Sequence, residues 1–490
     1  MKITHCIKTG LTTMFICGLT ACTGLFNEIN TDNNQPTKVT PDLLLNPLLR
    51  SLVQNQFNYN NGSALAHHLA RTNYNEVEQY AFGTNEGTWN AYYLHLNNIR
   101  EMIEVSQAAD RPSCKAIGYI LKAFAGSQLT DLWGNVPYFE AVQGAGNITP
   151  SYDLQKDIYT AQGGIIDLLE EAESILSSSN DVLPADIIFA GNRMKWRKLG
   201  NSLHLRYLMR ISNRETEITT FNLKQEIQKV MSRPLMETND DNMLLKYLAG
   251  SPNKCPIYDL RSGEFEYVRM SDEISQAMNT YQDPRMAIWF APTTNSATSA
   301  NPVYKGIPVG CSSTSLTQIG YSQADVSLLG NLYRTTPDAC SAVLMNCSEV
   351  KFLQAEAITR GYATGDVKSL YEAGVKNSLA YYNIKEETIN TYLSHSGVAY
   401  NASDALNQIM EQKWLSLFMV GYEAWFDFLR TGLPAQTSPK DNRNPSAPGQ
   451  VPSRFYYPEN EQAVNGIHYK EAIDLQGGSD NINTKLWWEK

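Results

Sequence analysis

Apolar residues recur at intervals of three and four along much of the chain, a pattern typical of amphipathic helices. In the stretch 403–434 they cover most of the helical circumference, which predicts one long helix buried on nearly all sides. We expect Ser403 or Asp404 to cap its start, and Gly432 and Pro434 to end it. Polar and charged residues among the apolar ones predict ion pairs with neighbouring segments, and they include Gln412, Lys413, Glu423, Asp427 and Arg430.

The same periodicity predicts a mainly helical fold with an irregular middle. Between about residues 232 and 340, Pro, Gly, Ser, Thr and Asn interrupt every apolar run, so we expect a long excursion with a few short strands or helices. The segment 130–138 is expected to be a tight aromatic turn, and 436–490 a loop-rich tail that folds back onto the core. Helices are predicted at residues 43–57, 89–108, 112–129, 153–176, 196–211, 345–360 and 367–382.

The last two predicted helices have complementary faces. Small residues, Ala355 and Ala357, lie on the first, while Tyr371 and Leu379 lie on the second. This pattern predicts an antiparallel helix pair of tetratricopeptide type.

The N-terminus has the pattern of an exported lipoprotein. Positive Lys2 and Lys8 precede a short apolar run at 11–19, and Leu19-Thr20-Ala21-Cys22 matches the bacterial lipobox. We therefore expect residues 1–21 to be a signal peptide and Cys22 to carry the lipid that anchors the chain; an ordinary secretory signal with a chance cysteine is the alternative. The polar residues 22–41 form a predicted tether, and no later apolar run approaches the roughly 20 residues needed to span a bilayer.

The cysteines do not form a recognisable metal-binding set. Without the signal peptide and the lipidated residue their number is odd, and no C-x-x-C pair occurs, so a zinc site is not expected. One disulfide remains open, either Cys340–Cys347 or Cys255–Cys311, although buried thiols are favoured. The five residues are Cys114, Cys255, Cys311, Cys340 and Cys347.

Charge and motifs exclude several classes of function. A net charge of −10 argues against a nucleic-acid partner, which requires a basic surface to displace counterions from phosphates. None of the motifs G-x-S-x-G, H-E-x-x-H, G-x-x-x-x-G-K or G-x-G-x-x-G occurs, so we expect no catalytic residues and no cofactor. We expect His67-His68 to form a solvated helix end and Asn239-Asp240-Asp241-Asn242 a polar turn, and we expect neither to be a metal site.

Aromatic residues in polar loops are the candidates for ligand binding. A pyranose presents an apolar face of C–H bonds that stacks on Tyr or Trp, while short polar side chains bind its hydroxyls. The loops 74–89 and 289–321 combine both kinds of residue. Trp89 and Trp133 are expected in the core. The candidates are Tyr74, Tyr80, Asn85, Trp289, Tyr304 and Tyr321, each with core packing as the alternative.

Dispersed motifs in a fixed order give the chain its clearest resemblance. Besides the lipobox, they are Asn27-Glu28-Ile29-Asn30 with Pro36, Thr130-Asp131-Leu132-Trp133-Gly134-Asn135-Val136-Pro137-Tyr138, Pro150-Ser151-Tyr152-Asp153, Lys195-Trp196-Arg197-Lys198-Leu199, Asn201-Ser202-Leu203, Leu205-Arg206, Ser348-Glu349-Val350, Glu356-Ala357, Gln412-Lys413-Trp414, Glu423-Ala424-Trp425 and Arg430-Thr431-Gly432. From Cys22 to Pro434 the chain resembles the SusD/RagB-type, or SusD-like, nutrient-binding lipoproteins of Bacteroidetes.

The resemblance implies a right-handed helical superhelix with tetratricopeptide-like pairs. Length alone predicts about three domains, but the resemblance implies a single domain over 42–490. It further implies a lipid-anchored protein of the outer membrane, facing the cell exterior, that binds oligosaccharides and delivers them to a SusC-like TonB-dependent barrel transporter. The chain departs from the family pattern at 23–26, since family members exported to the surface often carry acidic residues directly after the lipidated cysteine.

Three other functions remain as alternatives. The same architecture could capture peptides or protein fragments. A surface glycoside hydrolase is an alternative from another class, although one sequence cannot place two carboxylates about 5 to 9 Å apart. A structural transporter subunit without a ligand of its own is the third.

Overall fold

The computed structural model describes residues 39–57, 59–446 and 449–489, and of residues 264 and 265 only the backbone. Pro41–Lys490 form a compact unit, to which the following description refers. The predicted signal peptide, the lipidated Cys22 and the tether as far as residue 38 lie outside the described residues, and the predicted domain boundaries stay a prediction. Within the described ranges the chain is mainly helical with four short strands, so the predicted fold class is confirmed.

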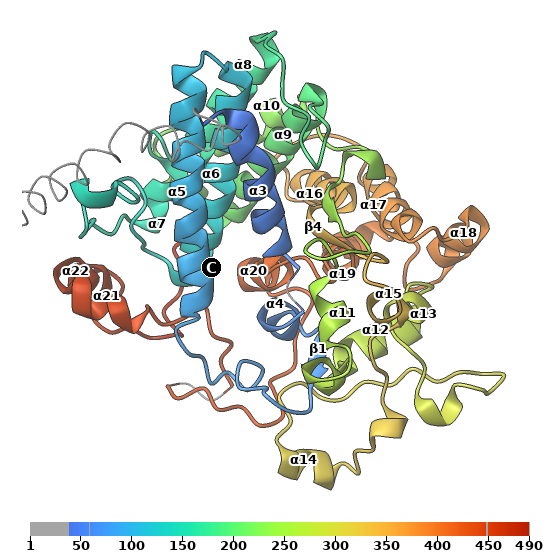
Figure 1. Ribbon diagram of the computed structural model, residues 1–490. Coiled ribbons are helices and arrows are strands. Elements are labelled where there is room, and N and C mark those ends of the chain that lie inside the picture. Colours follow the sequence, from blue (N-terminus) through green and yellow to red (C-terminus); the bar gives the residue numbers. More distant parts are fainter. Residues whose placement is uncertain (1–38, 58, 447–448, 490) are drawn as a thin grey trace, which may run out of the picture. The chain divides into compact units, whose positions relative to one another are not determined.

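Most of the first half of the unit is a layer of helices that pack on helices near them in sequence (Figure 1). Helix α6 lies in the middle of this layer, between α5 and α8. Its small residues allow close packing, because a Cβ at Gly118 would lie 2.5 Å from Ile103 and one at Gly126 would lie 2.4 Å from Tyr138. The helices of this half are α3 (Pro41–Gln54), α4 (Asn61–Leu65), α5 (Glu86–Ala108), α6 (Pro112–Trp133), α7 (Gln155–Thr160), α8 (Ile165–Ser178), α9 (Arg193–Arg210) and α10 (Leu223–Met231).

Two boundaries in this half differ from the prediction. The aromatic turn begins at Gly134, whose φ of +85° ends α6, so that Thr130 to Trp133 form the last helical turn. The helix predicted for 153–176 is two helices, α7 and α8. Gly164 allows the chain to fold tightly between them, since a Cβ there would lie 2.6 Å from the carbonyl oxygen of Ile158.

The middle region consists of loops with short elements, as predicted. Its helices are α11 (Pro256–Leu260), α12 (Asp272–Tyr281), α13 (Met286–Trp289), α14 (Ser313–Gln318) and α15 (Asn331–Arg334). Short 3₁₀ turns occur along the chain at η1 (Gly144–Gly146), η2 (Ser212–Glu217), η3 (Asn239–Asp241), η4 (Glu264–Tyr267), η5 (Thr294–Ser296), η6 (Gln323–Asp325) and η7 (Ala402–Asp404).

Two small antiparallel sheets connect this region to distant parts of the chain. Strand β1 (Leu69–Arg71) pairs with β3 (Val268–Met270), and β2 (Met243–Lys246) pairs with β4 (Ser341–Met345). In the first sheet Arg71 lies opposite Val268. The residues that follow β1 and those that precede β3 therefore leave the sheet at the same end.

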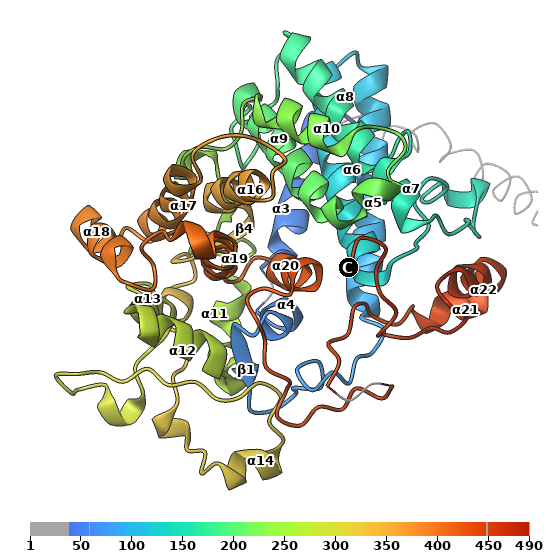
Figure 2. The same ribbon diagram turned by 180° about the vertical axis from the view of Figure 1, so that it is seen from behind.

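The C-terminal half contains the predicted helix pair, on the other side of the unit from α5 and α8 (Figures 1 and 2). Helices α16 and α17 are antiparallel, because Phe352 lies against Gly374 and Ile358 lies against Gly365. A Cβ at Gly374 would lie 2.7 Å from the ring of Phe352, so this close approach depends on glycine. The helices of this half are α16 (Cys347–Thr359), α17 (Val367–Tyr381), α18 (Glu386–Ser394), α19 (Ala405–Ser416), α20 (Glu423–Thr431), α21 (Glu459–Val464) and α22 (Gly466–Leu475).

The single helix predicted for 403–434 is wrong: the stretch forms α19 and α20, separated by a turn at 417–422. Met419 has a φ of +64° there, and the N–H of Gly421 donates to the carbonyl of Gln56 at 2.7 Å. The predicted cap also fails, because Asp404 precedes α19 without a side-chain capping bond. Gly432 does end α20 in the left-handed conformation, as predicted.

The charged residues of this stretch belong to a buried ionic network, which confirms the predicted ion pairs. Arg206 contacts Glu349 at 2.6 Å and Glu423 at 3.5 Å, and Arg210 joins Glu423 to Asp131 of α6. Two further pairs follow, Lys413 with Asp427 at 2.7 Å and Arg430 with Glu356 at 2.6 Å. Apart from Arg210 and Asp427, these charges come from the motifs that carry the family resemblance, so those motifs help to hold α6, α9, α16, α19 and α20 together.

The C-terminal tail folds back onto this core, as predicted. Trp488 is fully buried, and its indole N–H donates to Asp131 at 2.6 Å.

The five cysteines in the described ranges are free and buried, as favoured from the sequence, and neither of the two disulfides considered there is formed. The sulfur of Cys255 instead lies 3.1 Å from that of Cys340. Cys255 directly precedes α11 and Cys340 directly precedes β4, and spacing along the chain does not reveal this proximity because 84 residues separate them.

Candidate ligand-binding cleft

Two exposed tyrosines meet at the end of the β1–β3 sheet. Tyr74 follows β1 and is 60% exposed, while Tyr267 directly precedes β3 and is 37% exposed. The N–H of Thr72 donates to the carbonyl of Tyr267 at 3.0 Å and extends the pairing of the strands. The two rings lie 5.7 Å apart, centroid to centroid, at 72°, so one ring presents its edge to the other. Together they form a bent aromatic surface that faces solvent.

Local hydrogen bonds fix the loop that carries Tyr74. Tyr74 has a φ of +54°, and its N–H donates to the side chain of Asn73 at 3.0 Å. The amide of Asn75 donates to the carbonyls of Arg71 at 3.2 Å and Cys311 at 2.6 Å. The loop is therefore attached both to its own strand and to the middle region, which positions the ring in advance of any ligand.

Glu78 holds the far end of this loop from inside the protein. Its carboxyl accepts hydrogen bonds from the N–H of Arg71 at 3.0 Å and from that of Gly310 at 3.3 Å. Because the group is fully buried, the loss of water raises the pKa of Glu78 to about 8. At neutral pH this carboxyl is mostly protonated.

The other side of the cleft is held by Arg269 of β3. Its buried guanidinium donates to the carbonyl of Glu266 and, at 3.2 Å, to the hydroxyl of Tyr321. These bonds fix the backbone next to Tyr267. Tyr321, a candidate from the sequence, thus supports the cleft from behind.

The cleft itself has a volume of about 800 Å³. Beside the two tyrosines it is lined by amide and carboxylate side chains, which can bind hydroxyl groups as donors or acceptors. Aromatic faces next to short polar groups are what a sugar requires. The polar lining includes Asn60, Asn61, Glu76 and Glu266.

The remaining sequence candidates do not line this cleft. Tyr80 and Trp289 are enclosed by the core, and the ring of Trp289 stacks on Phe418 at 4.3 Å. Tyr304 is half-buried against the core, and the amide of Asn85 donates to the hydroxyl of Tyr422 at 3.2 Å. Trp89 and Trp133 lie in the core, as expected.

Tyr267 was missed from the sequence. The one signal available was its position in a short segment, 264–270, in which charged and apolar residues are mixed. Its proximity to Tyr74 depends on strand pairing across nearly two hundred residues, which spacing along the chain does not reveal.

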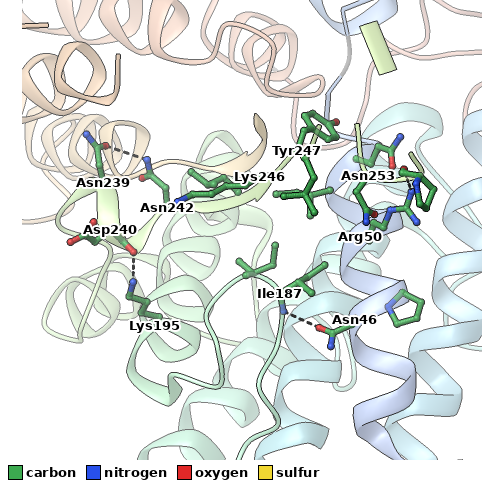
Figure 3. A pocket seen from close by; sticks show the side chains of 17 residues that line it. Asn46, Arg50, Ile187, Lys195, Asn239, Asp240, Asn242, Lys246, Tyr247 and Asn253 are labelled. Carbon is green, nitrogen blue, oxygen red and sulfur yellow. Dashed lines mark hydrogen bonds between the residues drawn. The ribbon is translucent and has the colours of Figure 1, made fainter. Parts of the chain in front are cut away.

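A second cavity of about 750 Å³ lies between α3, β2 and the start of α9 (Figure 3). The basic side chains of Arg50, Lys195 and Lys246 and several asparagines line it, and Lys195 donates to the carbonyl of Asp240 at 2.5 Å. Its aromatic residue, Tyr247, is buried and packs edge-on against Phe57. With no exposed ring among its described lining residues, this cavity fits a sugar less well than the Tyr74–Tyr267 cleft.

The motifs considered for metal binding have structural partners. The prediction of a solvated helix end at His67-His68 is wrong, because both residues are buried; His67 contacts Glu273 at 3.1 Å and His68 the carbonyl of Trp414 at 2.9 Å. The Asn239–Asn242 segment is a polar turn, as predicted. Asp241 caps it and pairs with Lys198 at 2.9 Å.

Comparisons with known proteins agree on one family. The family model SusD-like, described as starch-binding and associating with the outer membrane, matches residues 33–458. A SusD homologue from Bacteroides fragilis is 28% identical, with a TM-score of 0.79 over 92% of this chain and 100% of its own. An outer membrane protein from Bacteroides vulgatus, named for nutrient binding, is 28% identical over the same shares, with a TM-score of 0.81.

A protein named for chitin binding is 25% identical, with a TM-score of 0.76 over 92% of this chain and 100% of its own. A search of curated proteins found no match. No helix in the described part of the chain is long and apolar enough to cross a membrane.

Proposed function

The chain belongs to the SusD-like family of starch-binding proteins that associate with the outer membrane, and from this premise we propose that the Tyr74–Tyr267 cleft binds an oligosaccharide. The observation that carries the proposal is the pair of exposed rings at 72° to each other. Two rings at an angle can contact successive sugars of a curved or twisted chain, whereas one flat surface would favour a straight one.

The binding mechanism is reversible stacking with hydrogen bonds. The tyrosine rings cover the apolar faces of the sugars, and the amides and carboxylates of the lining bind their hydroxyls. Glu76 and Glu266 are both exposed, so they bind a sugar hydroxyl without first losing a buried partner. We propose no bond-breaking step, and the protein acts as a binding protein.

The cellular role proposed here follows the family. Lipidation at Cys22 anchors the protein to the outer membrane, facing the cell exterior. From there it delivers its ligand to a SusC-like TonB-dependent transporter. This part of the proposal rests on the lipobox motif and on family membership.

Calorimetry on the chain lacking residues 1–22 tests the ligand class. The panel contains malto-oligosaccharides and chito-oligosaccharides, chosen from the names of the family and of one similar structure, together with unrelated peptides. Binding of a glycan supports the proposal, and release of shorter sugars during the titration would indicate a hydrolase instead. Binding of peptides alone would favour peptide capture, and no binding at all would favour a purely structural subunit.

A further inference from the structure

Three side chains with metal-binding atoms converge where α8, α9 and α10 pack, and none of them lines the proposed cleft. They are Glu170 of α8, His204 of α9 and Glu226 of α10, and one ligand atom from each lies within 4.8 Å of the others. One of these separations, from Nε2 of His204 to Oε1 of Glu226, is 3.9 Å. This is too long for a hydrogen bond.

His204 is the unusual member of the cluster. It is fully buried, and neither ring nitrogen meets a hydrogen-bond partner within the described part of the chain. A buried polar group without a partner is costly, and most such groups are paired. The second carboxylate oxygen of Glu170, Oε2, is likewise buried and without a partner in the described structure. Both atoms belong to the same cluster.

The protonation states suit a metal ion. Burial lowers the pKa of His204 to about 3, so its ring is neutral and has a lone pair to donate. Burial alone would raise the pKa of Glu170, but hydrogen bonds from Arg233 and Lys229 outweigh it and lower the pKa to about 2. Glu170 is therefore an anion at neutral pH.

Two cations stand beside the carboxylates. Lys229 contacts Glu170 at 2.8 Å and Glu226 at 3.2 Å, and Arg233 contacts Glu170 at 2.8 Å. The side chain of Lys229 is 47% exposed, so it can turn into solvent when an ion takes its place. Arg233 is more buried and would stay on Glu170, where it orients the carboxylate from outside the metal.

We propose that Glu170, His204 and Glu226 bind a divalent transition-metal ion that cross-links α8, α9 and α10. Zinc binds both imidazole nitrogen and carboxylate oxygen, and the imidazole of His204 favours a transition metal over magnesium or calcium. Zinc holds such atoms at about 2.0–2.2 Å, so in a tetrahedral site they lie roughly 3.4 Å apart. The glutamates supply the small movement, because their side chains rotate while His204 is fixed by packing. This inference departs from the sequence prediction of no metal site and is independent of the proposed glycan binding.

Titration of tag-free protein with Zn²⁺ at pH 7, after dialysis against a chelator, tests the site. We expect about one zinc ion per chain and a rise in melting temperature with zinc. The variant Glu226→Gln keeps the shape of the side chain and should weaken zinc binding at least about tenfold. The variant His468→Ala removes the exposed His468–Glu471 pair on α22 and serves as control, with zinc binding unchanged.

The variant Lys229→Ala separates a metal site from a structural cluster. Removing the competing ammonium should strengthen zinc binding roughly two- to fivefold. If Lys229 served only in structural salt bridges, its removal would lower the stability of the protein and would not strengthen zinc binding. Melting in the absence of zinc shows whether each variant is folded. The proposal is overturned if the wild type binds no zinc, if Glu226→Gln binds it as tightly as the wild type, or if His468→Ala abolishes binding.

Discussion

The guanidinium of Arg430 donates hydrogen bonds to both carboxylate oxygens of Glu356, at 2.6 and 2.8 Å, although the residues lie 74 positions apart. Both side chains are buried, and Arg430 also contacts Asp427 at 3.0 Å. This buried bidentate pair fixes α20 on α16, because a shift of one helix relative to the other would leave a buried charge without its partner.

Removing one partner of this pair should therefore destabilise the protein strongly. Glu356→Ala removes one of the two carboxylates that neutralise the buried guanidinium of Arg430. We therefore expect a loss of about 3–5 kcal/mol in the free energy of unfolding. Urea unfolding followed by circular dichroism measures it. The exposed pair Lys368–Glu372 provides the control, and Glu372→Ala should leave the unfolding midpoint nearly unchanged. Equal effects of the two variants would contradict a special role for the buried pair.

The sequence predicted this helical core well because each long helix carries its own periodic signal. It did not reveal the break at 417–422, since the left-handed Met419 and the bond from Gly421 to Gln56 depend on a segment far away in sequence. The buried histidines show the same limit: the partner of His67 is 206 residues away. Charge and polarity alone suggested a solvated helix end.

Of the two tyrosines in the candidate cleft, the sequence identified one, because the position of the other depends on contacts between segments far apart in the chain. Tyr74 was identified because it lies in a polar loop, where an aromatic residue has no obvious core to join. Tyr267 was not identified, and Tyr80 and Trp289 turned out to be core residues, because exposure depends on strand pairing and loop packing. An aromatic residue in a loop has the same local signal whether it faces a ligand or the interior.

The buried Glu78 predicts a specific pH dependence of stability. Its pKa is about 8 in the folded protein and near the ordinary 4.5 when unfolded. Between pH 4.5 and about 8, Glu78 holds a proton in the folded state that it has lost in the unfolded state. The contribution of Glu78 to the free energy of unfolding is therefore fully present below pH 4.5 and declines as pH rises to about 8. Urea unfolding at pH 5, 6.5 and 8 should show the decline.

The variant Glu78→Gln isolates this effect, because it keeps the shape of the side chain but cannot ionise. The stability of the variant relative to the wild type should increase with pH by a few kcal/mol over this range. All other titrating groups are common to both proteins and cancel in the difference. A difference that stays constant from pH 5 to 8 would show that Glu78 is not protonated in the folded protein.

The contact between Cys255 and Cys340 predicts selective oxidation. Their sulfurs lie 3.1 Å apart, while the other three cysteines have no thiol partner in the described structure. Treatment of the chain lacking residues 1–22 with diamide, which is reduced to its hydrazine, should convert these two thiols to one disulfide and leave three thiols titratable after unfolding. Peptide mapping by mass spectrometry identifies the pair. In Cys255→Ser, no intramolecular disulfide should form, and a Cys340–Cys347 linkage in the wild type would contradict the prediction.

The two tyrosines of the cleft give the most direct test of the binding surface. Because both are exposed, Tyr74→Ala and Tyr267→Ala should leave the melting temperature nearly unchanged. Each should weaken binding of the glycan identified by calorimetry about tenfold, which corresponds to about 1.4 kcal/mol. Tyr267→Phe keeps the ring and should bind nearly as well as the wild type, because stacking needs the face of the ring and not its hydroxyl. The half-buried Tyr119 on α6 lies outside the cleft, so Tyr119→Ala should not alter affinity, and a loss there equal to that of Tyr74→Ala would place the binding surface elsewhere.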